Sequence, residues 1–331
     1  MGSSDFQKEI EQLIINQLID YLTVHFRENP NDLPYFPPVI IELIEALQEE
    51  NVSMNKVESI VQKDSTLALQ LLSASNSVLY NGLEEQHSIQ GALVRLGFQE
   101  THNIAMHVAF QTFFHKKASM IHKMFQRVRE EFFDYTLLTA YGSRLLGQVL
   151  NLGYGEILFL GGLFHDIGKI LILHALASGK AYEKFQIEVS ESYLFHLFEE
   201  LHVDLGVEFL SKNRIAKPII QIASEHHETN LLSESSNIFT HIIRVASFIA
   251  YELHFYPLAK FYDAEQLEKE YLVSRTALKI DSRAISEYRR EFMKIALHVL
   301  DVRTRLEQEA EKKVIEPTAS SEKPAKKTWV K

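Results

Sequence analysis

The chain contains no cysteine, and this absence excludes disulfides, thiolate metal ligands and cysteine nucleophiles. It agrees with a reducing compartment, and we expect the protein to be cytoplasmic. Glycine and proline are also scarce, with 13 and 8 among 331 residues, whereas leucine, isoleucine, glutamate and glutamine are common. That composition favours helix, and no segment shows a convincing strand alternation or an internal repeat.

Positive charge is in deficit as well. Lysine and arginine together number 34 against 44 acidic residues, which gives a net charge of −10. We therefore expect no nucleic-acid partner, because binding to phosphates depends on clustered Lys and Arg. The first residues lack the basic segment and apolar stretch of a signal peptide. Long apolar runs are missing too: none approaches 18 residues, so we expect no membrane partner.

Apolar residues recur at helical spacing along most of the chain. Ser53 and Asp64 are predicted to cap helix N-termini, and Gly97 is placed for a left-handed C-terminal residue. In the second half, we expect helices over 120–150, 156–177 with a break near Gly168, 181–198, 199–212, 217–227, 236–255 and 263–275.

Residues 165–169, His-Asp-Ile-Gly-Lys, are the segment that most strongly indicates a functional site. An adjacent imidazole and carboxylate suit a divalent metal ion, and Lys169 could balance the charge of a phosphate. Gly168 is expected to let the backbone turn closely. A P-loop is excluded, because Lys169 is followed by Ile170 where Ser or Thr is required.

Six blocks of sequence resemble the pattern of HDOD domains, with matching order and spacing over roughly residues 28–255. One departure is Ser65, where that family usually has proline. The blocks are Leu-Pro-Tyr-Phe-Pro at 33–37, Val-Gln-Lys-Asp-Ser-Thr-Leu at 61–67, Ala-Ser-Asn-Ser at 74–77, Ser-Ile-Gln-Gly-Ala-Leu-Val-Arg-Leu-Gly at 88–97, Gly-Leu-Phe-His-Asp-Ile-Gly-Lys at 162–169 and Glu-His-His-Glu at 225–228.

The resemblance implies an all-α, two-lobed helical fold whose second lobe is related to HD-type metal phosphohydrolases. It also implies a role in bacterial signal transduction. With this frame, the predicted parts are an N-terminal amphipathic helix (1–29), the first HDOD lobe (30–118), the HD-like lobe (119–260), C-terminal helices (261–313) and a disordered tail (314–331). The tail holds the only tryptophan, Trp329, to which we assign no role.

The same resemblance identifies the candidate metal ligands and two losses among them. HD phosphohydrolases take one further His upstream of the His-Asp pair and one Asp well downstream. These positions fall on Tyr135 and Ser247, which replace the expected ligands. The candidate metal ligands that remain are His165, Asp166, His202, His226 and His227. They could hold one ion of Fe, Mn or Zn, or none, since buried His-Asp hydrogen bonds also occur without metal. Lys169 matches the family lysine and would be catalytic only in an enzyme.

Three functions remain open, and the sequence favours the first. It is a non-catalytic regulatory module that acts through protein partners of a signalling pathway. Such a module could form a homodimer through the terminal helices at 5–28 and 283–313, although their apolar stripes also suit core packing. The second is a metal-dependent phosphohydrolase. The third is a nucleotide-binding sensor without turnover, with Lys169 and the histidine cluster as its phosphate pocket.

Overall fold

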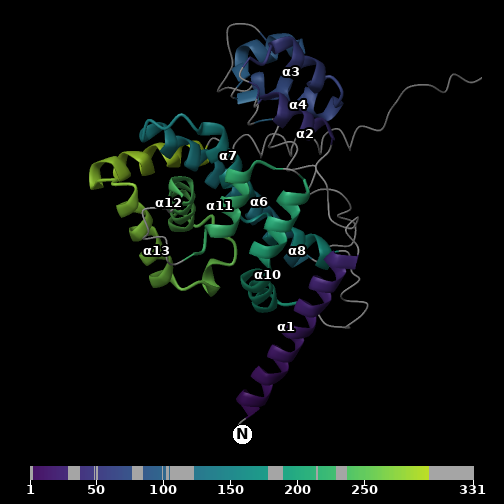
Figure 1. Ribbon diagram of the computed structural model, residues 1–331, viewed down its shortest axis with the longest axis vertical. Helices are drawn as coiled ribbons and strands as arrows, with labels where there is room; N and C mark the ends of the chain where they lie inside the picture. The colour runs from purple at the N-terminus through teal and green to yellow at the C-terminus, as the bar shows by residue number, and fades with distance from the viewer. Residues whose placement is uncertain are drawn as a thin grey trace, which may run out of the picture.

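The protein, shown as a computed structural model in Figure 1, is built from helices. The structure describes residues 3–28, 38–47, 51–76, 85–98, 123–177, 189–213, 215–228 and 237–297, with isolated positions at 49, 100, 101 and 104. No strand occurs within these residues, and the predicted all-α class is confirmed. The predicted tail with Trp329 lies outside them.

A small lobe of short helices lies at the top of Figure 1. Two of the predicted caps are present: the Ser53 hydroxyl accepts from the Lys56 N–H at 3.3 Å, and the Asp64 carboxylate accepts from the Leu67 N–H at 3.0 Å. Gly97 has the predicted left-handed backbone, with φ of 72°. The helices are α2 (Pro38–Leu47), α3 (Met54–Val61), α4 (Ser65–Ser75) and a further helix, Ile89–Phe98.

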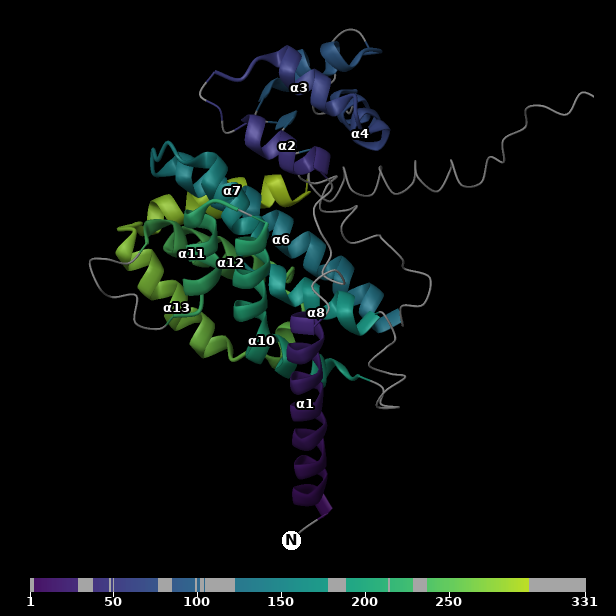
Figure 2. The same ribbon diagram turned by 45° about the vertical axis from the view of Figure 1, so that its right-hand side comes forward.

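The larger lobe forms around the long helix α6, which contacts α7, α8 and α12. Helix α10 packs on α8 and α11, and α12 packs on α13, as both ribbon views show (Figure 2). The elements are α6 (Lys123–Val149), α7 (Gly155–Phe164), α8 (Ile167–Ala177), α10 (Glu191–Lys212), α11 (Lys217–Glu225), α12 (Ile238–Glu252), the 3-10 turn η3 (Ala259–Phe261), α13 (Ala264–Ala277) and a helix over 282–297.

Two predicted helix boundaries are wrong. The boundary predicted between 198 and 199 is absent, because nothing around 198–200 stops a helix and α10 runs through it; residues 181–188 of the first predicted helix lie outside the described residues. The start of α10 is set by Ser190, whose hydroxyl accepts from the Tyr193 N–H at 3.2 Å. The break predicted near Gly168 lies instead at residues 165 and 166, and α8 starts at Ile167.

Helices α7 and α8 provide the apolar centre of the larger lobe. Residues Gly155–Leu176 are long and apolar enough to cross a membrane by length and composition, yet 89% of that stretch is buried inside the protein. Burial on all sides is what a core helix of this composition requires. The His-Asp pair therefore sits at a turn inside the core.

The terminal helices use much of their apolar surface within the core. In α1 (Ser3–Glu28), Leu18, Leu22 and Phe26 are buried, and α1 contacts α10. In the helix over 282–297, Tyr288 and Phe292 are fully buried. The N-terminal half of α1 instead projects from the body in both ribbon views.

Candidate metal centre

The turn between α7 and α8 brings His165 and Asp166 into the core. Helix α7 ends at Phe164 and α8 begins at Ile167, so both residues lie between two buried apolar helices. Their side chains are 2% and 1% exposed. A carboxylate is rarely buried this deeply unless cations or hydrogen-bond donors surround it.

Gly168 allows α10 to approach this turn. A Cβ atom at position 168 would lie 1.8 Å from the carbonyl oxygen of His202, and a Cβ at Gly206 would lie 3.3 Å from the Gly168 nitrogen. The two glycines thus permit backbone contact between α8 and α10, which places His202 beside Asp166. The expectation of a tight turn at Gly168 is replaced by this close helix crossing.

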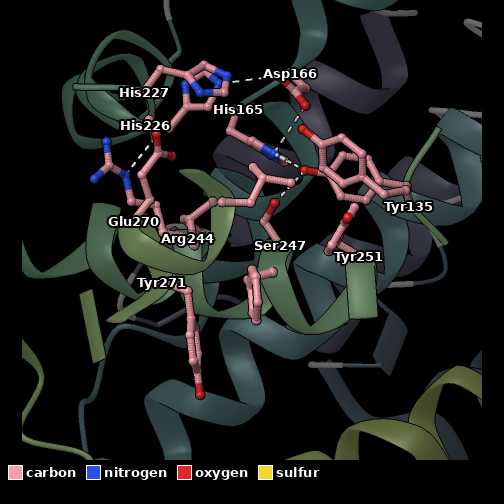
Figure 3. A pocket seen from close by; sticks show the side chains of 14 residues that line it. Tyr135, His165, Asp166, His226, His227, Arg244, Ser247, Tyr251, Glu270 and Tyr271 are labelled. Atoms are coloured by element: carbon pink, nitrogen blue, oxygen red, sulfur yellow. Dashed lines mark hydrogen bonds and ion pairs between the residues drawn. The ribbon is translucent and has the colours of Figure 1, made fainter. Parts of the chain in front are cut away.

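Asp166 is the centre of the cluster, and Figure 3 draws it with two of its partners, His165 and His226. Its Oδ1 lies 3.2 Å from His226 Nε2 and 3.5 Å from His202 Nε2. Its Oδ2 lies 2.9 Å from Lys169 Nζ and 3.4 Å from His165 Nε2. The fold therefore brings together residues that lie up to 60 positions apart.

Backbone carbonyls fix the tautomers of three histidines. The Nδ1–H groups of His165, His202 and His226 donate to carbonyl oxygens of their own helices at 2.8, 2.5 and 2.9 Å. A carbonyl can only accept, so in the neutral imidazoles each Nε2 carries a lone pair. The same second hydrogen bond orients histidines that bind metal ions in proteins.

Four donor atoms converge on one point. One ligand atom each from Asp166, His202, His226 and His227 lies within 4.8 Å of all the others. The Nε2 atom of His227 is buried without a hydrogen-bond partner in the described part of the chain. Converging lone pairs need a positive centre, either a proton on His226 or a metal ion. Three imidazoles and a carboxylate are the number and type of ligands that Zn²⁺, Fe²⁺ or Mn²⁺ accept. These four residues fit a single divalent ion.

The two replaced positions meet at the other side of His165. The Tyr135 hydroxyl lies 2.9 Å from His165 Nε2 and 2.7 Å from the Ser247 hydroxyl. Because His165 Nε2 can only accept, Tyr135 donates to it and Ser247 donates to Tyr135. The Nε2 lone pair of His165 is therefore occupied by a proton donor. His165 and the two replaced ligand positions form the half of the site that lies outside the four-donor cluster. We call Tyr135, His165 and Ser247 the tyrosine triad.

Lys169 is an internal cation. Its side chain is fully buried, its ammonium pairs with Asp166, and it lies 5.8 Å from the ring centroids of Phe132, Tyr256 and Tyr262. Aromatic faces attract a desolvated cation, so this surrounding stabilises the charge. Lys169 is also absent from the lining of the cavity beside the cluster, so it does not face a phosphate there.

Burial decides the protonation of the site. It lowers the pKa of His165 to about 4 and holds the pKa of His202 and His227 well below the usual value. Burial alone would raise the pKa of Asp166, but Lys169 and His165 outweigh it and hold that pKa well below its usual value. At neutral pH Asp166 is thus an ionised carboxylate, and His165, His202 and His227 are neutral imidazoles.

A small cavity of about 40 Å³ adjoins the cluster. Its lining includes His165, Asp166 and the His226–His227 pair, and Figure 3 shows Tyr271 on the opposite side from them. Phe248 also lines the cavity. One water needs roughly 10–15 Å³ on this measure, so the cavity has space for a few waters. Sites for drug-sized ligands take roughly 300–1,000 Å³.

The structure thus gathers all five predicted ligands, but only four share the cluster. Two residues that position the site, Gly206 and Arg244, were not predicted from the sequence. Nothing in the sequence around Gly206 distinguishes it from other glycines. Arg244, which donates to the carbonyl of His226 at 2.7 Å, is marked in the sequence only as a charged residue within an apolar helix.

Comparison with known proteins shows which family and fold the chain resembles. The model of the HDOD domain family matches residues 33–229. An HDOD domain protein with unknown function from Geobacter sulfurreducens has a similar structure, with a TM-score of 0.63 and 17% identity over 85% of this chain and 97% of that one. A protein from Shewanella amazonensis SB2B, named "Putative metal-dependent phosphohydrolase", gives a TM-score of 0.60 and 20% identity over 86% of this chain and 99% of that one.

A curated relative is more distant. An uncharacterised protein of Treponema pallidum (strain Nichols) is 18% identical over 214 residues, which cover 62% of this chain and only 40% of the relative. The solved structures share the fold at low identity. The family match, which spans more than half of the sequence, is the decisive observation: the chain belongs to the HDOD domain family.

Proposed function

We propose that this protein is a non-catalytic regulatory module whose former hydrolase site holds one structural divalent ion. The tyrosine triad carries the proposal. Tyr135 donates to the only lone pair that His165 can offer, and Ser247 satisfies Tyr135 in turn. A second ion would have to break both hydrogen bonds inside the core.

Two further observations support the absence of turnover. The cavity of about 40 Å³ is too small for a phosphodiester substrate. Lys169 is fully buried and paired with Asp166, so no free cation from this motif faces that cavity. These features also count against a nucleotide-binding sensor at this site.

The bound ion would act through Asp166, His202, His226 and His227, which come from the α7–α8 turn, α10 and the end of α11. Metal binding at a preformed site stabilises the folded state in proportion to the logarithm of ligand concentration. The ion would therefore hold three helices together, and the surfaces of those helices could report its presence to a partner.

The proposal is tested by hydrolysis assays on protein loaded with Mn²⁺, Fe²⁺ or Zn²⁺. We expect no turnover of bis-p-nitrophenyl phosphate or cyclic dinucleotides above that of the Asp166→Ala variant. Turnover by the wild type that Asp166→Ala abolishes would instead support the phosphohydrolase, the function that the four-donor cluster favours as second candidate.

Partner binding is proposed through the exposed ends of the terminal helices. Ile10 and Leu13 in the projecting part of α1 are 43% and 59% exposed, and Leu297 is 65% exposed. We propose a second copy of the chain as one occupant of these surfaces. Light scattering should then show a dimer that Ile10→Glu with Leu13→Glu dissociates, and a monomeric wild type would contradict it.

A further inference from the structure

The end of helix α11 carries the two adjacent histidines of the cluster. Helix α11 has nine residues and ends at Glu225, and His226 and His227 form the turn that follows. The last carbonyls of a helix have no partner within it and carry the negative end of its dipole. Within this turn the Glu228 N–H donates to the Glu225 carbonyl at 2.9 Å, and an outside donor to the remaining carbonyls would stabilise it further.

Arg244 of α12 supplies that donor. Its Nε donates to the His226 carbonyl at 2.7 Å, and its Nη2 donates to the carbonyls of Glu228 at 2.5 Å and Glu225 at 3.4 Å. The side chain is 7% exposed and lies beside the His226–His227 pair in Figure 3. One guanidinium thus spans the whole turn.

The two imidazoles depend on this turn to different degrees. His226 is also held by its Nδ1 bond to the Ala223 carbonyl. The Nε2 of His227 has no hydrogen-bond partner among the described residues, so its position follows from the backbone that carries it. The His226 backbone keeps right-handed helical angles, with φ of −65° and ψ of −14°. Two consecutive residues can direct their side chains to one centre only while the turn that follows the helix keeps its shape.

Arginine is suited to this task in a way that lysine is not. The guanidinium is planar, and its Nε–H and Nη–H groups reach different carbonyls at once, whereas an ammonium group is a single point of donation. Helix α12 holds Arg244 firmly, because Ile243 and Val245 on either side of it are fully buried.

We infer that Arg244 is a positioning residue that fixes the His226–His227 turn in the arrangement needed to bind one divalent ion. The inference rests on the single-ion site proposed above. It predicts a loss of metal affinity in variants that keep all four ligands.

The test is a titration of metal-free protein with Co²⁺, followed by calorimetry and by the visible spectrum of the bound ion. We expect Arg244→Met and Arg244→Lys to raise the Kd about 10–100-fold, the range for residues that orient metal ligands, with a changed Co²⁺ spectrum in Arg244→Lys. Arg275→Met is the matched control. Arg275 donates to the carbonyl of Ile280 at 3.0 Å, capping the turn after α13, and its loss should leave the Kd unchanged.

Histidine side-chain NMR of the metal-free protein tests the positioning role of Arg244 separately from the single-ion site. The His226 Nδ1–H should be protected from exchange in the wild type and exposed in Arg244→Lys, which retains the charge and is the variant less at risk of unfolding. Wild-type Kd values and unchanged exchange in a folded Arg244→Lys would overturn the role of Arg244. A wild type that binds no Co²⁺, with exchange that still depends on Arg244, would refute the ion site alone.

Discussion

Replacing Tyr135 with phenylalanine tests whether the tyrosine triad stabilises the fold. The Tyr135 side chain is 1% exposed, and its hydroxyl makes hydrogen bonds of 2.9 Å to His165 and 2.7 Å to Ser247. The ring itself would remain, so the change removes only the hydroxyl. His165 Nε2 would then be a buried acceptor without a donor, which costs about 1–3 kcal/mol. Ser247 lines the cavity and can turn its hydroxyl to water there, so it adds little.

We therefore expect Tyr135→Phe to lower the free energy of unfolding of metal-free protein by about 1–3 kcal/mol in urea titrations followed by circular dichroism. Tyr288→Phe is the matched control. Tyr288 is fully buried, but its hydroxyl has no hydrogen-bond partner in the described part of the chain. Its loss should be neutral or stabilising. If both variants unfold at the same urea concentration as the wild type, the tyrosine triad is not a stabilising device.

Three further predictions concern the same site. Burial lowers the pKa of His165 to about 4, so the unfolded chain binds more protons than the folded protein between that pH and about 6.5. The free energy of unfolding should therefore fall as pH drops through this window, by up to roughly 1.4 kcal/mol per pH unit for each such histidine. A flat profile in urea melts at different pH would refute this prediction. Gly168→Ala should destabilise the protein by about 1–3 kcal/mol or more and weaken Co²⁺ binding, because its Cβ would meet the His202 carbonyl at 1.8 Å; an unchanged melting temperature and Kd would show that α8 and α10 can separate freely. Adding a chelator to metal-loaded protein should lower its melting temperature, whereas chelation should leave the melting of Asp166→Ala unchanged; equal shifts in both would place the ion elsewhere.

Much of the fold was predictable because the sequence signals were local or came in ordered blocks. Ser53 and Asp64 cap the helices that they were predicted to cap, since a side-chain oxygen next to an apolar helix acts over three residues. The prediction divided helix α10 between residues 198 and 199, where the sequence contains no helix-breaking residue.

The candidate site was predictable as a set of residues but not as an arrangement. The resemblance placed Tyr135 and Ser247 at lost ligand positions, yet only the structure shows that they bond to each other across 112 residues. Sequence reasoning assigned Lys169 to a phosphate, whereas burial and its pairing with Asp166 turn it inward. Gly168 and Arg244 act through contacts with distant backbone, which no local pattern encodes.

The number of ions bound per chain tests the central claim most directly. Metal-free protein should be saturated with Mn²⁺, Fe²⁺ or Zn²⁺, desalted and measured by elemental analysis, beside the double variant Tyr135→His with Ser247→Asp. We predict one ion per chain in the wild type, because the tyrosine triad occupies the other half of the site, and a second ion in the double variant, because two metal-binding side chains then face His165. Two ions in the wild type, or none, would contradict the account.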